Sequence, residues 1–262
     1  MCSGIPISLA SFGYMTLEGK VAMVTGASSG IGASTVRKLR QAGVRVAGGA
    51  RRVDRIEADV ALALDVTDEA SAAAFVEQGI AELGGLDILF NNAGLALGRY
   101  PFSESTEEDE RRVLHTNLDG VMRVTRLCLP HIRDAGHILF MGSIAGRQAY
   151  ENGASYIAAK FGLRGFVYAL REDLLGRPIR VTTVDAGLVE TEFSVVRFGD
   201  DVDKAKAVYE GVDPITPDEV ADCIMFALTR PLHVNVDEIV IKALQQSSGA
   251  RIVRRTDRRS AS

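Results

Sequence analysis

Several features that would point to a membrane, a nucleic acid or a disulfide scaffold are missing from this 262-residue chain. No apolar run approaches the roughly 20 residues that a membrane-spanning helix needs. The formal net charge is only −4, so the charge balance gives no reason to expect nucleic acid or an anionic membrane as a partner. Hydrophobic residues make up 47% of the chain and charged residues 24%, which predicts a soluble globular protein with a substantial core.

Cysteine is scarce, and its spacing argues against a structural or metal-binding role. The three cysteines, Cys2, Cys128 and Cys223, form neither a CxxC pair nor a cluster with histidine. We therefore expect no metal site and no disulfide, with Cys128 and Cys223 packed in reduced form on apolar helix faces. The first residues lack the basic and apolar regions of a signal peptide, so we expect a cytoplasmic protein.

Apolar strand-like runs alternate with helical patterns along most of the chain, which is typical of βα units and a parallel sheet. Strands are predicted at Val21–Thr25, Val44–Ala50, Ala61–Leu64, Ile88–Asn91, His137–Met141, Arg180–Val184 and Glu238–Ile241. Helices are predicted at Ile31–Gln41, Glu69–Glu82, Glu107–Arg133, Ser155–Leu174 and Pro217–Thr229. Several strands are nearly continuous apolar runs, as expected of strands buried on both faces. The pattern predicts an α/β fold, a Rossmann-type doubly wound seven-stranded parallel sheet with helices on both faces.

No linker interrupts this alternation, so we expect a single domain at residues 17–249. Residues 1–16 are predicted to be a flexible extension and residues 250–262 a basic tail. The tail is interpreted as solvated or as an arm on a neighbouring subunit, in preference to a nucleic-acid contact. Only ten residues lie between Ala50 and Ala61, so the crossover there is predicted to hold a single helical turn or less.

The run TGASSGIG at 25–32 follows the first strand and opens the first helix. Glycines at Gly26, Gly30 and Gly32 permit a tight turn and let backbone N–H groups approach a pyrophosphate at the helix N-terminus. Ser28 and Ser29 add hydroxyls that can bond the turn or the phosphates. A glycine-rich turn of purely structural use is the alternative. The context of strand, turn and helix favours a dinucleotide site.

Further motifs accompany this turn: Asn91-Asn92-Ala93-Gly94, Asn117 in HTNLDG, Ser143 in MGSIAG and Tyr156-x-x-x-Lys160. With these motifs the chain resembles the short-chain dehydrogenase/reductase family from Leu17 to about Gly249. The resemblance implies a Rossmann-fold enzyme that moves a hydride between a nicotinamide cofactor and an alcohol or carbonyl. The cofactor contacts are expected from Gly26, Ser28, Ser29, Gly30, Ile31, Gly32, Arg51, Arg52, Asp65, Val66, Asn92, Ala93, Gly94, Tyr156, Lys160, Gly187, Val189 and Thr191.

The choice of cofactor follows from the residues at the end of the second strand. An enzyme that uses NAD needs an acidic side chain there to accept a hydrogen bond from the ribose 2′-hydroxyl. Here Ala50 occupies that position and is followed by Arg51 and Arg52, which are suited to pairing with a 2′-phosphate. The sequence therefore predicts NADP(H). Two solvated arginines on an enzyme that accepts both cofactors are the alternative.

Tyr156 and Lys160 lie one helical turn apart, so their side chains share a helix face. A tyrosine alone is a poor base at neutral pH, but a nearby ammonium would favour the phenolate and lower the pKa of Tyr156. Tyr156 is therefore the expected acid/base, and Ser143 is expected to hold the substrate oxygen. The resemblance implies that Asn117 holds a water linking Lys160 to solvent. His115 is read as a packed or surface histidine.

The segment after Thr191, with SIAGR at 143–147 and the stretch from His233 to Gly249, resembles the NADP-dependent 3-hydroxy acid dehydrogenases. That branch oxidises serine, allo-threonine and related hydroxy acids. We expect Arg147 and Arg197 to bind the substrate carboxylate beside Ser143 and Tyr156. For each arginine, a surface position or a salt bridge within the lid is the alternative.

Two other classes of function remain open on the sequence. One is a biosynthetic ketoreductase or aldehyde reductase, for which the acidic charge balance gives little support where a carrier protein is the partner. The other is a non-catalytic NADP sensor, which would have no use for an intact proton relay. Related enzymes imply a homotetramer or homodimer paired through Glu107–Arg133 and Ser155–Leu174.

Overall fold

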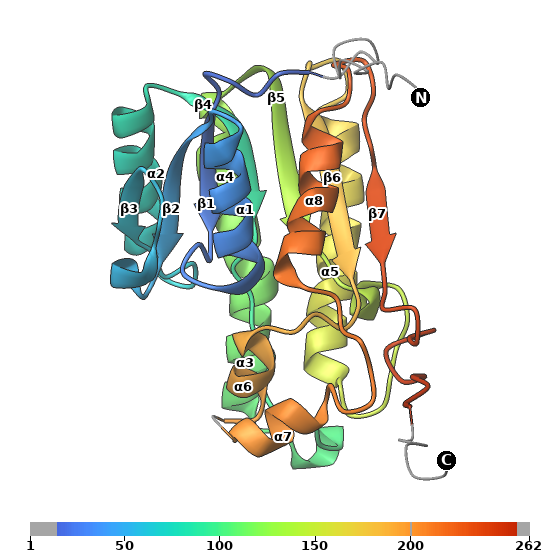
Figure 1. Cartoon of the computed structure of the whole chain (residues 1–262). Coiled ribbons are helices and arrows are strands. Elements are labelled where there is room, and N and C mark those ends of the chain that lie inside the picture. Colours follow the sequence, from blue (N-terminus) through green and yellow to red (C-terminus); the bar gives the residue numbers. More distant parts are fainter. Residues whose placement is uncertain (1–14, 200, 256–262) are drawn as a thin grey trace, which may run out of the picture.

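The computed structural model describes residues 15–199 and 201–255, so most of the expected N-terminal extension and the end of the tail lie outside the described residues. Seven parallel strands form a single sheet in the order β3-β2-β1-β4-β5-β6-β7, which confirms the predicted doubly wound fold (Figure 1). The strands are β1 (Val21–Thr25), β2 (Arg45–Ala50), β3 (Val60–Ala63), β4 (Leu86–Asn91), β5 (Ile132–Met141), β6 (Arg180–Ala186) and β7 (Glu238–Ile241).

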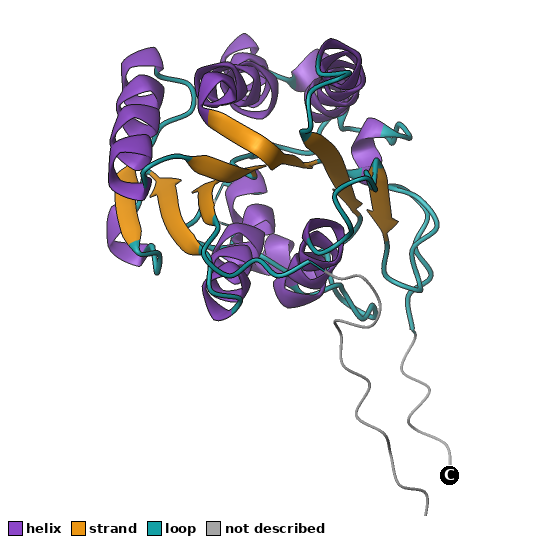
Figure 2. Ribbon diagram, turned by 90° about the horizontal axis from the view of Figure 1, so that it is seen from above, coloured by secondary structure: helices purple, strands orange, loops and turns teal. Residues whose placement is uncertain are grey.

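Helices cover both faces of the sheet, as Figure 2 shows from above. They are α1 (Gly30–Gln41), α2 (Glu69–Leu83), α3 (Glu107–Leu114), α4 (Gly120–Cys128), α5 (Ala154–Asp173), α6 (Glu192–Arg197), α7 (Val202–Ala207) and α8 (Pro217–Leu228). On one face, α2, α4 and α5 pack around buried Phe75 and Phe140. On the other, α1 and α8 pack around Phe90. Burial of these apolar faces is the main stabilising contribution.

Local sequence signals explain where several helices begin and end. Asp68 caps α2 by accepting a hydrogen bond from the Ser71 N–H at 2.6 Å, and Gly84 ends this helix with a left-handed φ of 75°. Thr216 and Glu219 form a capping box at the start of α8, where Pro217 occupies the first turn. No helix among the described residues is long and apolar enough to cross a membrane.

The predicted long helix at 107–133 is interrupted and ends early. A π-helical turn at His115–Asp119 separates α3 from α4, and a 3-10 turn at Leu129–His131 follows α4. Pro130 has no N–H to continue an α-helix, and Ile132 already pairs with Leu86 of β4. The last residues assigned to the helix from sequence therefore belong to β5.

The crossover between β2 and β3 contains only a 3-10 turn, Val53–Arg55, as the short spacing predicted. Two short helices, α6 and α7, were not predicted. They lie in the segment after β6 and form a layer beyond the carboxyl ends of the strands, below the sheet in Figure 1. The described part of the tail packs on the chain after α7, where the N–H of Arg255 bonds the Gly211 carbonyl at 2.8 Å.

Candidate active site

A cavity of about 650 Å³ opens at the carboxyl edge of the sheet, the position where doubly wound folds bind ligands. Most residues assigned from the sequence line it: Gly26, Ser28, Ser29, Gly30, Ile31, Arg51, Arg52, Asp65, Val66, Asn92, Ala93, Gly94, Asn117, Ser143, Tyr156, Lys160, Gly187, Val189 and Thr191. The cavity joins the glycine-rich turn to the Tyr156–Lys160 pair, although these segments are far apart in the sequence.

At Gly26 and Gly32 the glycine-rich turn packs too closely on its neighbours to admit a side chain. A Cβ on Gly32 would lie 2.2 Å from the carbonyl oxygen of Gly26, and one on Gly26 would lie 2.8 Å from Nδ2 of Asn92. Gly26 also has a left-handed φ of 67°. Ser29, at the start of α1, makes no side-chain cap bond, so its side chain does not occupy the N–H groups of the first turn. This cradle fits a pyrophosphate at a helix N-terminus.

Arginine side chains lie at one end of the cavity, beside the turn. Arg52 donates from Nη2 to Oγ of Ser29 at 3.1 Å and to the Glu192 carboxylate at 2.7 Å. Arg55, which no sequence motif indicated, donates from Nη1 to the other oxygen of Glu192 at 3.3 Å. Hydrogen bonding by Arg52 holds the pKa of Glu192 below its usual value. This cluster can bind an additional phosphate if Glu192 gives way.

Asp65 and Asn92 are held by contacts that fix the floor of the cavity. The Asp65 carboxylate accepts hydrogen bonds from the hydroxyl of Thr67 at 2.6 Å and from its N–H at 2.9 Å, and the hydroxyl bond lowers the pKa of Asp65. Asn92 donates from Nδ2 to the carbonyl of Thr25 at 3.0 Å. The backbone N–H of each is also bonded, that of Asp65 to the Ser71 hydroxyl at 2.9 Å and that of Asn92 to the Thr25 hydroxyl at 2.9 Å, so both residues are fixed in place.

Tyr156, Lys160 and Ser143 converge at the other end of the cavity. Lys160 is buried and donates from Nζ to the carbonyl of Met141 at 2.9 Å. Its Nζ lies 5.7 Å from the centre of the Tyr156 ring. The hydroxyl of Ser143 accepts a hydrogen bond from the N–H of Ala145 at 3.1 Å, which holds Ser143 at the end of β5.

The protonation states of this pair follow from burial. Burial lowers the pKa of Lys160 to about 8, and the Asp185 carboxylate opposes this fall. Burial also raises the pKa of Tyr156, as does Tyr150, while a hydrogen bond with Ser143 and the charge of Arg197 lower it. The net direction for Tyr156 differs from the expected lowering by Lys160, because desolvation of the phenolate dominates. At neutral pH the phenol is therefore protonated.

Asn117 is fully buried within the π-helical turn, and its side chain is occupied by backbone groups. Nδ2 donates to the carbonyls of Leu95 at 2.6 Å and Val113 at 2.8 Å, while Oδ1 accepts from the N–H of Leu95 at 3.2 Å. The side chain therefore fastens the segment after β4 to the helix that borders the site. His115, two residues earlier, lines the cavity and lies 3.6 Å from Asp119.

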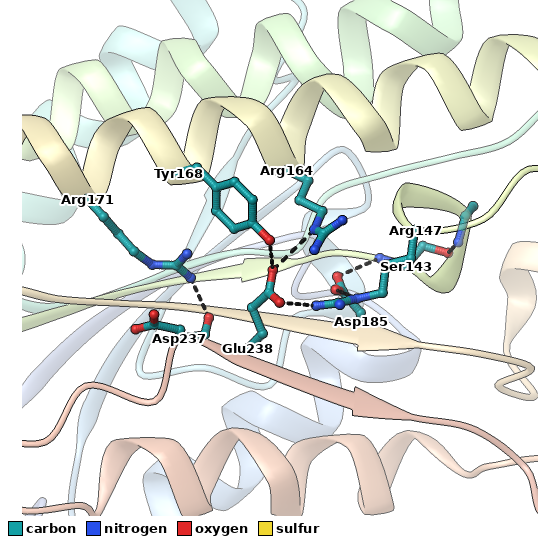
Figure 3. Close-up of polar contacts among 9 residues, drawn as sticks. Ser143, Arg147, Arg164, Tyr168, Arg171, Asp185, Asp237 and Glu238 are labelled. Atoms are coloured by element: carbon teal, nitrogen blue, oxygen red, sulfur yellow. Dashed lines mark hydrogen bonds and ion pairs between the residues drawn. The ribbon is translucent and has the colours of Figure 1, made fainter.

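Arg147 is held away from the cavity by two carboxylates. Nε donates to Asp185 at 2.5 Å, and Nη2 forms an ion pair with Glu238 at 2.5 Å. Figure 3 shows the guanidinium directed at these two residues, with Arg164 and Tyr168 of α5 also bonded to Glu238. Because Asp185 also accepts from the N–H of Ser143 at 3.1 Å, the structure gives Arg147 a supporting position behind Ser143.

Arg197, at the end of α6, lies beside Tyr156. Its guanidinium is 5.8 Å from the centre of the Tyr156 ring and 5.7 Å from that of Tyr150. It donates to the carbonyl of Gly98 at 3.1 Å and to the hydroxyl of Tyr150 at 3.2 Å. Among the described residues, no carboxylate pairs with it. The ring of Phe193, one turn earlier in the same segment, has its centre 5.7 Å from that of the Tyr156 ring.

Comparisons with known proteins agree with this geometry. Residues 20–200 match the model of the family described as short chain dehydrogenase. An NADP-dependent 3-hydroxy acid dehydrogenase of Schizosaccharomyces pombe is 39% identical over 254 residues, which cover 91% of this chain and 98% of the relative. A serine 3-dehydrogenase of Agrobacterium fabrum is 36% identical over 237 residues, covering 86% and 94%.

Solved structures of similar fold include serine dehydrogenases. The closed form of a serine dehydrogenase complexed with NADP+ superimposes with a TM-score of 0.83 at 36% identity, covering 90% of this chain and 100% of that one. A serine dehydrogenase from Escherichia coli gives a TM-score of 0.73 at 31% identity, covering 87% and 99%. The relatives found by sequence and by structure are thus of the same kind, dehydrogenases of 3-hydroxy acids or of serine.

Proposed function

Because this chain belongs to the short-chain dehydrogenase family, we propose that it is an NADP(H)-dependent oxidoreductase that interconverts a 3-hydroxy acid and its carbonyl form. The observation that carries the proposal is that one cavity joins Tyr156, Ser143 and Lys160 to the glycine-rich turn and to Arg51 and Arg52. NADP is named for the relative from Schizosaccharomyces pombe and for the solved serine dehydrogenase complex, which supports this cofactor.

The residues of the chain would divide the reaction between them. NADP(H), when bound, supplies or accepts the hydride. Tyr156 donates its proton to the substrate oxygen in reduction and removes it from the hydroxyl in oxidation. Ser143 hydrogen-bonds the same oxygen and orients it. Lys160, with a pKa of about 8, is largely an ammonium at neutral pH and stabilises the phenolate that proton transfer leaves behind.

Asn117 has a positioning role in this proposal. Its amide is committed to Leu95 and Val113, so the side chain fixes the wall of the site. A relay of protons from Lys160 to solvent would then use the backbone of the π-helical turn and water, while the amide holds that turn in place. Pre-organisation of this kind keeps the acid/base pair in register with the substrate.

Arg197 is the proposed partner of the substrate carboxylate. Its neighbours are the Gly98 carbonyl and the side chains of Tyr150 and Tyr156, which leave the guanidinium charge available for an anion. A carboxylate there would lie close to the Tyr156 ring, as a 3-hydroxy acid with its hydroxyl at Tyr156 requires. Tyr150 would orient the guanidinium. The contacts of Arg147 with Asp185 and Glu238 support a role behind Ser143 for that residue.

The test follows NADP+ reduction at 340 nm with a panel of 3-hydroxy acids, including serine, and with matched alcohols that lack the carboxylate. Turnover of the acids but not of the alcohols is expected. For Arg197→Ala, KM for every acid should rise by about tenfold or more, which corresponds to loss of a charge-assisted hydrogen bond. An unchanged KM would rule out Arg197 as the carboxylate partner.

A reductase of a pathway-specific ketone or aldehyde is the second candidate, because the same Tyr156, protonated at neutral pH, is suited to reduction. NADPH binding without turnover of any 3-hydroxy acid would favour it.

Self-association as a homotetramer or homodimer in the cytoplasm also stays a proposal. It is supported by exposed Phe161 and Tyr168 on α5, one of the helices expected to pair, and light scattering of the purified protein would test it.

A further inference from the structure

Glu192 places a carboxylate on the arginines at the cofactor end of the cavity. Oε2 lies 2.7 Å from Nη2 of Arg52, and Oε1 lies 3.3 Å from Nη1 of Arg55, so each oxygen meets a different guanidinium. Arg52 also donates to Ser29 at 3.1 Å. Arg51, Arg52 and Glu192 line the cavity together with the glycine-rich turn, and Glu192 links Arg55 to Arg52. A ligand phosphate at this end of the cavity would need the same guanidinium donors.

The backbone of Glu192 cannot easily withdraw from this end of the cavity. Thr191 caps α6 by accepting a hydrogen bond from the N–H of Phe193 at 3.2 Å. The side chain of Thr191 also lies against the glycine-rich turn, since a Cβ on Gly30 would lie only 3.1 Å from its Cγ2. Glu192 therefore starts its helix directly beside the phosphate-binding turn. Only its side chain is free to turn away.

We infer that Glu192 is a cofactor-selectivity residue whose carboxylate competes with the 2′-phosphate of NADP(H) for Arg52 and Arg55. The inference rests on the proposed use of NADP(H). A 2′-phosphate must displace the carboxylate or share the guanidinium groups with it, and the two anions repel each other. NADH has only a hydroxyl at that position and needs no such exchange. Glu192 therefore narrows the difference in affinity between NADPH and NADH that the arginines would otherwise create.

The size of the effect is limited by solvent. The side chains of Arg52, Arg55 and Glu192 are 44%, 53% and 48% exposed, so their interactions are strongly screened. Removing the negative charge should then change the dissociation constant of NADPH by about three- to tenfold. The change is large enough to measure and small enough that the fold is not at risk.

The experiment compares Glu192→Gln with Glu190→Gln. Both variants lose one negative charge from the same segment, but Glu190 is exposed, does not line the cavity and shows no contact with Arg52 or Arg55. Dissociation constants of NADPH and NADH are measured by the fluorescence of the reduced nicotinamide, which is uncomplicated because the chain has no tryptophan. Adenosine 2′,5′-bisphosphate and 5′-AMP, measured by calorimetry, isolate the contribution of the 2′-phosphate.

For Glu192→Gln we expect a three- to tenfold smaller dissociation constant for NADPH and for adenosine 2′,5′-bisphosphate, with NADH and 5′-AMP within about twofold of the parent protein. Glu190→Gln should leave all four within about twofold. Unchanged or weaker NADPH binding by Glu192→Gln overturns the inference, as does an equal gain for NADH. A parent protein that binds neither NADPH nor NADH would instead overturn the proposed function.

Discussion

Replacement of Arg147 by methionine tests the buried charges behind Ser143. Arg147 is bonded to Asp185, whose side chain is 4% exposed, and to Glu238, which is 20% exposed. Methionine fills similar volume without charge, so it leaves the Asp185 carboxylate buried without this partner. Breaking a buried ion pair from one side costs about 3–5 kcal/mol in free energy of unfolding. Since Arg147 itself is 22% exposed, we expect the lower end, about 3 kcal/mol.

The stability cost of Arg147→Met should depend on pH through the carboxyl group of Asp185. Burial raises the pKa of Asp185 above its usual value, and Arg147 opposes that rise, so the pKa should climb further in the variant. A carboxyl with a raised pKa in the folded state binds more protons there than in the unfolded chain. The free energy of unfolding then falls as pH rises through the interval between the two pKa values. The cost of Arg147→Met should therefore be largest near pH 7 and smaller near pH 5.

Thermal unfolding followed by circular dichroism at the two pH values provides the measurement. A cost of about 3 kcal/mol should lower Tm by roughly 6–12 °C near pH 7. Arg37→Met is the matched control, because Arg37 pairs with Asp218 at the surface, where the side chains are 46% and 56% exposed, and should cost at most about 1 kcal/mol. If Arg147→Met costs no more than Arg37→Met, or costs more near pH 5 than near pH 7, the reasoning about Asp185 is wrong.

Two further predictions concern the cavity itself. Tyr156→Phe should lower kcat by about 10²–10⁴-fold while the dissociation constant of NADPH, followed by fluorescence, changes little; retained turnover would assign the proton transfer to another group. Gly32→Ala should weaken NADPH binding by more than about tenfold, because its Cβ would lie 2.2 Å from the Gly26 carbonyl oxygen, a backbone atom that cannot yield cheaply. Gly165→Ala, in α5 with nothing within 4 Å of the added Cβ, should bind NADPH normally, and binding losses of equal size in both variants would contradict the steric argument.

Local patterns predicted most of the fold and the shared helix face of Tyr156 and Lys160. The strands were visible as apolar runs, and the spacing of Tyr156 and Lys160 placed both side chains on one face of α5. The two short helices α6 and α7 escaped because six residues give too little periodicity to recognise. Their caps, Thr191 and Asp201, were the available signals. The early start of β5 could have been anticipated from Pro130.

The two arginines assigned to the substrate show where sequence reasoning ends. Arg147 and Arg197 follow equally suitable motifs, and nothing local separates them. Their surroundings do: Arg147 meets Asp185 and Glu238, which come from β6 and β7, whereas Arg197 meets neutral groups. Partners of this kind are brought together only by the sheet. For the same reason the contact of Arg52 and Arg55 with Glu192 was beyond prediction.

The π-helical turn at His115–Asp119 limits where the sequence can accept an insertion or a deletion. A π turn contains one residue more than the α-helical turn it replaces, so α3 and α4 are offset by about 100° from one continuous helix. Deleting one residue there would restore a regular α-helix but would rotate α3 relative to α4. Either the hydrogen bond between Asn117 and Leu95 would break, or Val113 would leave its buried position. Insertions and deletions should therefore be excluded from this turn, while the exposed turn at residues 175–178 should tolerate them.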